Sequence, residues 1–192
     1  MRDTATRLIE EAARLIVDAG YNGFSYADLA EAIGIRKASI HHHFPSKVDL
    51  VVAVVEQRRA AIRAQVDALE HGTPDAMLQL RAYVDYWKRC IEDQSSPFCL
   101  AGVLAVELPS LPAEVAVAVQ GHFNDLAQWL ERVMVLGKKQ GTIELEMNPR
   151  ISSQFFQTTV YGAMVMARAY NDPNKFNAII DAFMQRMRPK RR

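Results

Sequence analysis

The chain has 192 residues, a formal net charge of +1 at pH 7 and 49% hydrophobic residues. This composition provides a real apolar core and excludes a disordered chain, while the near-zero net charge means that any signal for nucleic acid must be local. The two cysteines, Cys90 and Cys99, form no disulfide framework. The N-terminus has no signal-peptide pattern, and no apolar run reaches the ~20 residues of a membrane span. We therefore expect a cytoplasmic protein with no membrane partner.

Apolar residues recur at helical spacing from Thr4 to Ala19, and Gly20 closes this first helix. A turn follows at residues 21–23. Ser25 then stands three residues before Asp28, a capping-box-like start for a helix that ends at Gly34. A second short helix, from Arg36 to Phe44, contains cations and histidines but no acid.

A long helix is predicted from Ser46 to Gly72, and its start is again marked by a serine three residues before an aspartate, Asp49. Further helices are expected over residues 75–91, 98–108, 112–140, 148–170 and 173–187. The alternating TIELEM segment (residues 142–147) is expected to be a loop, because a single strand has nothing to pair with. The predicted fold class is all-α, with about nine helices.

Residues 24–47 form the pattern of a helix-turn-helix: a capped helix, a glycine turn and a second short helix with polar outward positions. The second helix of this motif is the one that enters the DNA major groove. Arg36, Lys37 and Lys47 make the segment locally positive, which suits phosphate binding.

The segment from Thr6 to Leu50 closely resembles the DNA-binding domain of TetR-family transcriptional regulators. The resemblance is carried by AG-Y-x-G-F (residues 19–24), ADLAEAIGI (residues 27–35) and H-x-F-x-S-K (residues 42–47). It implies two domains: residues 1–47 as a helix-turn-helix DNA-binding domain, and residues 48–192 as a larger helical domain for ligand binding and dimerisation, joined by the long helix.

The resemblance also implies the residues that contact DNA. Base or phosphate contacts are expected from the recognition helix, and backbone contacts from the starts of the flanking helices. His41 stands where the family usually has tyrosine, and Arg36 replaces the usual small hydroxyl residue. The full expected set is Ser25, Tyr26, Arg36, Lys37, Ser39, His41, His42 and Lys47.

Two further sets of residues are expected in the larger domain. Aromatic and apolar side chains between its helices are candidates for a pocket that takes a hydrophobic or aromatic ligand, with ordinary core packing as the alternative: Tyr83, Tyr86, Trp87, Phe98, Cys99, Val103 and Phe123. The last two helices are candidates for a four-helix interface with a second copy, through Phe155, Phe156, Tyr161, Met164, Phe176, Ile179, Ile180 and Phe183.

Cys99 opens an apolar run that resembles the corresponding region of TetR-type repressors that sense electrophiles through a cysteine. The sequence shows no neighbouring cation that would lower the pKa of its thiol, so a small buried hydrophobe is the alternative interpretation. Metal binding by His41, His42 and His43 is not expected, because successive helical residues point about 100° apart. We expect no cofactor.

The sequence thus predicts a DNA-binding transcriptional regulator, with repression as the expected outcome. It would bind a near-palindromic operator as a homodimer and be released by a small hydrophobic or aromatic effector, or by thiol modification. A ligand-independent DNA-binding regulator is the main alternative. An enzyme is not expected, since G-x-S-x-G, P-loop, G-x-G-x-x-G and H-E-x-x-H motifs are all absent from the sequence.

Overall fold

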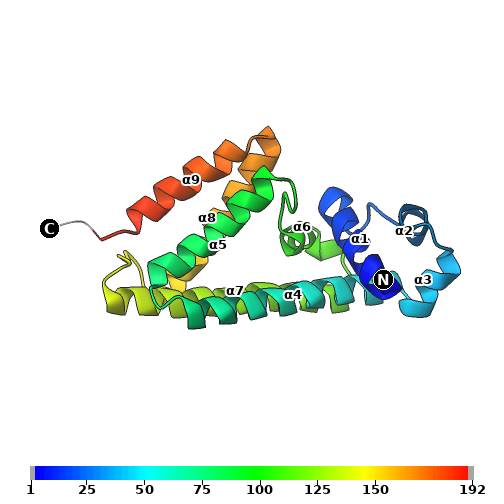
Figure 1. The fold of residues 1–192 in the computed structure, drawn as a ribbon, viewed down its shortest axis with the longest axis horizontal. Helices are drawn as coiled ribbons and strands as arrows, with labels where there is room; N and C mark the ends of the chain where they lie inside the picture. Colours follow the sequence, from blue (N-terminus) through cyan, green and yellow to red (C-terminus); the bar gives the residue numbers. More distant parts are fainter. Residues whose placement is uncertain (1–2, 190–192) are drawn as a thin grey trace. The chain divides into compact units, whose positions relative to one another are not determined.

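The computed structural model describes residues 3–189, and it is helical throughout. The described chain contains nine α-helices and one short 3-10 helix, with no strand, so the predicted all-α class is confirmed (Figure 1). The helices are α1 (Thr4–Ala19), α2 (Tyr26–Ile33), α3 (Lys37–His43), α4 (Lys47–Gly72), α5 (Ala76–Glu92), α6 (Leu100–Val106), η1 (Leu108–Ser110), α7 (Ala113–Gln140), α8 (Pro149–Tyr170) and α9 (Pro173–Arg186).

The helix starts follow the capping residues of the sequence. At α2, the Ser25 side chain accepts from the backbone of Asp28 while the Asp28 carboxylate accepts from the Ser25 amide at 2.7 Å, which completes a capping box. The same reciprocal arrangement joins Ser46 and Asp49 at the start of α4. Asp75 and Asn148 cap α5 and α8. These local hydrogen bonds explain why the helix boundaries could be predicted closely.

The chain divides into two compact units. Unit 1 comprises residues 1–62 and 99–123, and unit 2 comprises residues 63–98 and 124–192. Helices α4 and α7 each contribute to both units. This division differs from the expected boundary at residues 47 and 48, because α6, η1 and the start of α7 belong to the same unit as the N-terminal helices.

Unit 1 is held by one apolar core. In Figure 1, α1, α2 and α3 gather beside the first turns of α4. Each of these helices contributes fully buried side chains to the cluster, and α6 and α7 close it. Its most buried members include Leu8, Ile16, Leu29, Ile40, Leu50, Val54, Leu104 and Val119.

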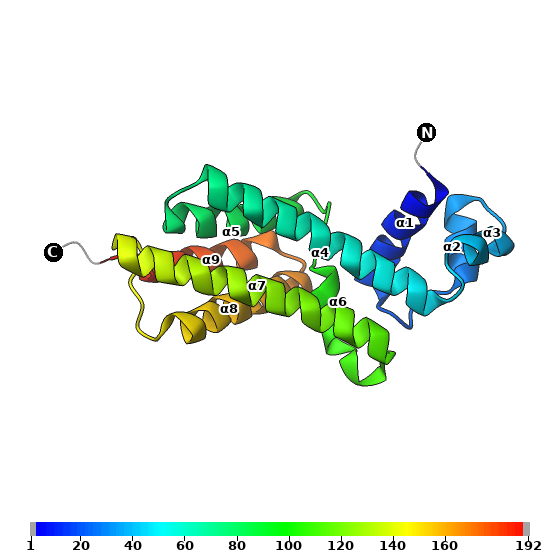
Figure 2. The same ribbon diagram turned by 90° about the horizontal axis from the view of Figure 1, so that it is seen from below.

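Unit 2 contains α5, α8 and α9 with the ends of α4 and α7. Helices α8 and α9 run side by side, and α9 also packs on α5 (Figure 2). Phe156, Phe176 and Ile180 are completely buried here. The TIELEM segment is a loop, as predicted, and its Ile143 packs against Gly137 of α7, where a side chain larger than hydrogen would collide with it.

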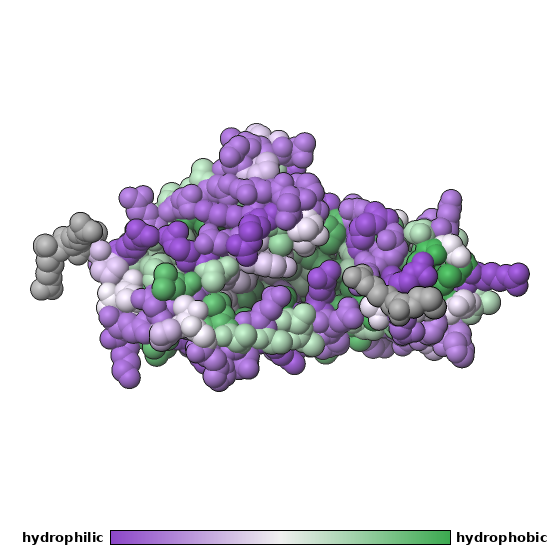
Figure 3. All heavy atoms as spheres, in the orientation of Figure 1, coloured by the Kyte–Doolittle hydropathy of each residue, from purple (hydrophilic) through white to green (hydrophobic). Residues whose placement is uncertain are grey.

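The outer face in Figure 3 is mostly hydrophilic, with smaller apolar areas between the charged side chains (Figure 3). Across residues 3–189, no helix combines the length and the apolar character that crossing a membrane requires.

Candidate nucleic-acid interface

Helices α2 and α3 are joined by a tight left-handed turn. Gly34 has φ 72° and ψ 38°, a conformation that costs glycine little and other residues about 1–2 kcal/mol. The Ile35 amide donates to the Ala30 carbonyl at 3.0 Å and closes the turn. Ile40 is the only buried residue of α3, so this side chain anchors the helix while the others face outward or lie at the edge.

The outward surface of α3 is positive. Arg36, Lys37, His41 and His42 are exposed, whereas Ser39 is half-buried. Arg36 is the N-cap of α3 and its side chain makes no capping hydrogen bond, so its guanidinium is presented at the start of the helix. Residues 36–43 include no carboxylate that would cancel this charge. The surface is therefore suited to phosphates and to acceptor atoms on base edges.

Four residues of the expected DNA-contact set have their side chains engaged within the protein: Ser25, Tyr26, His41 and Lys47. The Ser25 hydroxyl donates to the Asp28 carboxylate at 2.7 Å, so its proton is committed to the capping box. The carboxylate of Asp28 is stabilised by these Ser25 hydrogen bonds, which lower its pKa. A phosphate contact near Ser25 would therefore have to come from the backbone.

Tyr26 is buried, so the DNA contact expected at the start of α2 would have to come from its backbone and not from its ring. Its hydroxyl lies 3.0 Å from the Phe44 carbonyl and 2.5 Å from the Ser46 carbonyl, and it can donate its one proton to either. Burial, with the charge of Asp49, raises its pKa to about 12. The side chain thus ties the end of α3 to the start of α4 and does not reach the surface. His41 packs edge-on against its ring at 4.9 Å and contacts the Pro45 carbonyl through Nδ1 at 3.1 Å.

The Lys47 side chain is likewise turned into the protein, so the DNA contact expected at the start of α4 would have to come from the backbone. Its ammonium donates to the Phe24 carbonyl and lies 4.2 Å from the centre of the Phe24 ring and 4.7 Å from that of Tyr21. Burial lowers the pKa of this ammonium. The side chain therefore holds unit 1 together, and the exposed cations of the interface are Arg36 and Lys37.

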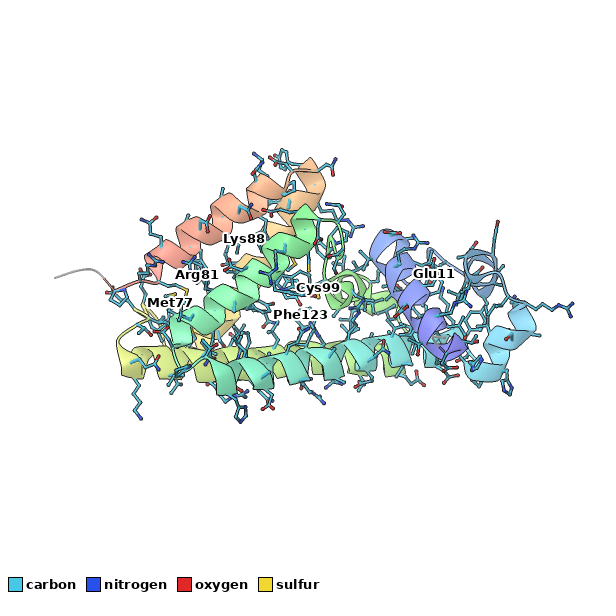
Figure 4. All side chains as sticks on the ribbon, in the orientation of Figure 1. Glu11, Met77, Arg81, Lys88, Cys99 and Phe123 are labelled. Atoms are coloured by element: carbon cyan, nitrogen blue, oxygen red, sulfur yellow. The ribbon has the colours of Figure 1, made fainter. Side chains whose placement is uncertain are left out.

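The expected ligand-binding residues are divided between the two units. Tyr83, Tyr86, Trp87 and Phe98 belong to unit 2, and Cys99, Val103 and Phe123 belong to unit 1. In unit 2, Tyr83 packs against Trp129 at 5.4 Å and Phe156 at 6.3 Å, while Trp87 lies one helical turn away on α5. The indole N–H groups of Trp87 and Trp129 are buried without a hydrogen-bond partner among the described residues. Figure 4 shows Met77, Arg81 and Lys88 along the same helix (Figure 4).

Cys99 has a neighbour that the sequence pattern did not reveal. Cys99 is the N-cap of α6, and its Sγ lies 3.8 Å from Nε2 of His122 on α7. Both residues are buried and both belong to unit 1. Their separation of 23 positions in sequence follows no ligand or catalytic spacing, so only the fold brings the thiol and the imidazole together.

The expected dimer residues fall into two groups. Phe156, Met164, Phe176 and Ile180 are buried inside the protomer, which removes them from the candidate contact surface because their faces already pack within unit 2. Tyr161, Ile179 and Phe183 are half-buried, and Phe155 is 55% exposed. An exposed apolar face does run along α8, and it is formed by Ile151, Phe155, Val165, Met166 and Tyr170.

No group of three or more histidine, cysteine or acidic side chains within residues 3–189 could hold a metal ion.

Taken together, the glycine turn, the buried anchor of α3 and its acid-free outward face define a helix-turn-helix DNA-binding regulator. The sequence model "Bacterial regulatory proteins, tetR family" matches residues 8–54, and "Tetracyclin repressor-like, C-terminal domain" matches residues 76–183. The second match alone spans more than half of the chain. The protein belongs to the TetR family of transcriptional regulators.

Known relatives agree with this assignment. A TetR-family regulator from Agrobacterium tumefaciens is 44% identical and superposes with a TM-score of 0.94 over 96% of this chain and 97% of that one. A TetR regulator from Legionella pneumophila is 28% identical, with a TM-score of 0.86 over 98% and 99% of the two chains. The transcriptional activator FasR of Mycolicibacterium smegmatis is 29% identical over 115 residues, which are 59% of this chain and 52% of FasR. The match thus spans about half the length of that curated relative.

Proposed function

We propose that the protein is a cytoplasmic, homodimeric transcriptional repressor. It would bind a near-palindromic operator and be released from it by an effector. The observation that carries the DNA-binding part is the exposed, acid-free surface of α3, with Arg36 and Lys37 at its start and Ile40 fixing the helix from behind. A helix presented in this way enters the major groove end-first, and its first residues meet base edges.

The apolar face of α8 supports the homodimer. Ile151, Phe155, Met166 and Tyr170 recur at helical spacing along one side of the helix and are exposed in the single chain. Gly162 lies on the same side, and a Cβ added to it would meet no atom within 4 Å. A second copy packed on this face would bury the apolar stripe and use the small residue for close approach of the two backbones.

The interior of unit 2 supports a small-molecule effector. The buried indole N–H groups of Trp87 and Trp129 make no hydrogen bond within the described chain, and an unpaired buried donor costs about 1–3 kcal/mol. A hydrophobic or aromatic molecule that carries an acceptor oxygen would pair with such a donor. We propose that its binding alters α4, and thereby the separation of the two recognition helices in the dimer.

Thiol modification is a second candidate for the signal, and the contact between Cys99 and His122 favours it. An imidazole next to a thiol can take its proton and so generate the nucleophilic thiolate. The exchange of Cys99→Ser tests this route, because it removes the nucleophile and leaves the packing almost unchanged. If the Ser variant is released from DNA by thiol-reactive compounds as readily as the wild type, this route is wrong.

Selection of bound DNA from a random pool, followed by binding measurements with and without candidate effectors, tests the proposal as a whole. A recovered two-part site and an effector that lowers affinity for it are expected. DNA binding that no compound affects would favour a ligand-independent regulator instead. If the regulated genes lose expression when the gene for this protein is deleted, the protein is an activator and not a repressor. Activation is the role that the name of FasR gives to that relative.

A further inference from the structure

The end of α6 makes a hydrogen bond to the N-terminal helices that neither the family match nor the sequence pattern points to. The Glu107 carboxylate accepts from the backbone amide of Tyr21 at 2.7 Å, across 86 residues of sequence. Tyr21 lies in the turn between α1 and α2, and Glu107 is the C-cap of α6. Both residues belong to unit 1.

The turn is shaped to receive this carboxylate. Gly20 has a φ of 77°, and a Cβ at this position would lie 2.8 Å from Cδ of Glu107. The backbone conformation favours glycine, and a Cβ here would force the Glu107 carboxylate to move away from the turn. The contact is thus built into two distant parts of the chain.

The same turn holds Lys47, and this places Glu107 in a larger polar group. The Lys47 ammonium lies over the Tyr21 and Phe24 rings and donates to the Phe24 carbonyl, which stands directly before the N-cap of α2. The charge of Glu107 favours the protonated form of Lys47 and partly opposes the effect of burial on its pKa. We refer to Tyr21, Phe24, Lys47 and Glu107 as the Lys47 cluster.

The Lys47 cluster connects four elements: the α1–α2 turn, the start of α2, the first residue of α4 and the end of α6. Glu107 is its only member from outside residues 1–62. Within the Lys47 cluster, α6 is linked to the helix-turn-helix by the Glu107 side chain, beside the apolar packing of α6 on α1.

We propose that Glu107 is a positioning residue for DNA recognition, which fixes the helix-turn-helix relative to α4 and α6 so that the two copies in a dimer meet half-sites at one particular spacing. This inference rests on the proposed homodimeric DNA binding. A carboxylate suits the role because its charge-assisted hydrogen bond is directional and stronger than a neutral one.

The test measures the spacing preference of the dimer. Affinity is determined for the selected operator and for operators in which one base pair is added or removed between the half-sites. The wild type should prefer the selected spacing. Glu107→Gln keeps the size of the side chain and an acceptor oxygen but loses the charge, and Glu107→Ala loses the hydrogen bond altogether. We expect the spacing preference to fall in the Glu107→Gln variant and to fall further in the Glu107→Ala variant. The fall in Glu107→Ala should be roughly tenfold, the change expected when one charge-assisted hydrogen bond is lost.

A matched control is available in Glu114. This exposed residue of the first turn of α7 acts electrostatically on the Tyr21 hydroxyl, so Glu114→Gln removes the same charge near the same turn. The control should retain the wild-type preference. A variant that had merely lost stability would bind all three operators less well by the same factor when measured well below its unfolding temperature.

The outcomes separate this inference from the proposed function. If the wild type shows a spacing preference and Glu107→Ala keeps it in full, the positioning role is wrong and the proposed function stands. If the wild type binds no operator made of two half-sites, the proposed function is wrong, and the positioning role of Glu107 is wrong with it. A loss of preference in Glu107→Ala but not in Glu114→Gln supports the inference.

Discussion

Two lysines of unit 1 show how burial decides what a cation does. Lys37 is exposed on α3, whereas the Lys47 ammonium is turned onto the Phe24 carbonyl and two aromatic rings. The sequence predicts a side-chain contact with DNA for Lys37 and a helix-start contact at Lys47, but it reports only the charge of the two residues and not the direction of their side chains. The direction of Lys47 depends on the rings of Tyr21 and Phe24, which only the folded turn brings to it.

The two lysines should therefore respond differently to substitution. Lys37→Ala should weaken binding to all DNA sequences and reduce the slope of log affinity against log salt by about 1. Lys47→Met should leave that slope unchanged and lower the free energy of unfolding by about 1 kcal/mol, through the lost hydrogen bond and ring contacts. Fluorescence anisotropy over a range of salt and urea unfolding measure the two effects. Equal changes in salt slope would contradict the assignment.

Tyr26 should make the protein sensitive to alkali. Its pKa is about 12 in the fold against 10 for an ordinary tyrosine, so between these values the unfolded chain loses the proton while the folded chain keeps it. The folded state then binds more protons, and the stabilising contribution, complete below pH 10, is lost as pH rises toward 12.

Tyr26→Phe tests this account. At pH 8 the variant should be less stable by about 1 kcal/mol, because the Phe44 and Ser46 carbonyls lose their donor. Between pH 8 and pH 11 it should lose less stability than the wild type does. Urea unfolding at both pH values decides the matter, and parallel losses in the two proteins would show that Tyr26 does not titrate as described.

At the scale of helices, the sequence predicts what local hydrogen bonds determine. The starts of α2 and α4 follow from serine–aspartate pairs, and the end of α2 follows from Gly34. The contacts between Glu107 and Tyr21 and between Cys99 and His122 could not be predicted, because they join residues 86 and 23 positions apart without any shared pattern. Only some of the expected dimer residues are accessible in the single chain, since apolar side chains of α8 and α9 lie on two faces and hydropathy does not distinguish the core from an exposed stripe.

The glycines at the ends of α1 and α2 should differ in their tolerance of alanine. Both have positive φ, but Gly34 faces open space whereas Gly20 faces the Glu107 carboxylate. Gly34→Ala should cost about 1 kcal/mol, the penalty of the left-handed conformation alone. Gly20→Ala should cost about 2–3 kcal/mol, because the backbone strain adds to the loss of the Glu107–Tyr21 hydrogen bond when the carboxylate moves aside. Thermal unfolding of both variants provides the comparison, and equal costs would contradict the close approach of Glu107.

At the scale of the whole molecule, the exposed face of α8 should control assembly if the proposed homodimer forms through it. Phe155→Glu places a charge in the middle of the stripe and should convert the proposed dimer to a monomer with little loss of helix content. Val117→Glu, at another exposed apolar position, is the matched control and should remain dimeric. Sedimentation velocity and circular dichroism measure both properties. A Phe155→Glu variant that is still dimeric would place the interface elsewhere.

The central claim is that α3 reads DNA in two copies. Selection of bound fragments from a random DNA pool by the full-length protein tests this most directly. We expect a near-palindromic site whose half-sites are centred about 34 Å, or one helical turn, apart. A variant that carries both Arg36→Ala and Lys37→Ala should enrich no such site. Recovery of no enriched sequence, or undiminished enrichment by the double variant, would contradict it.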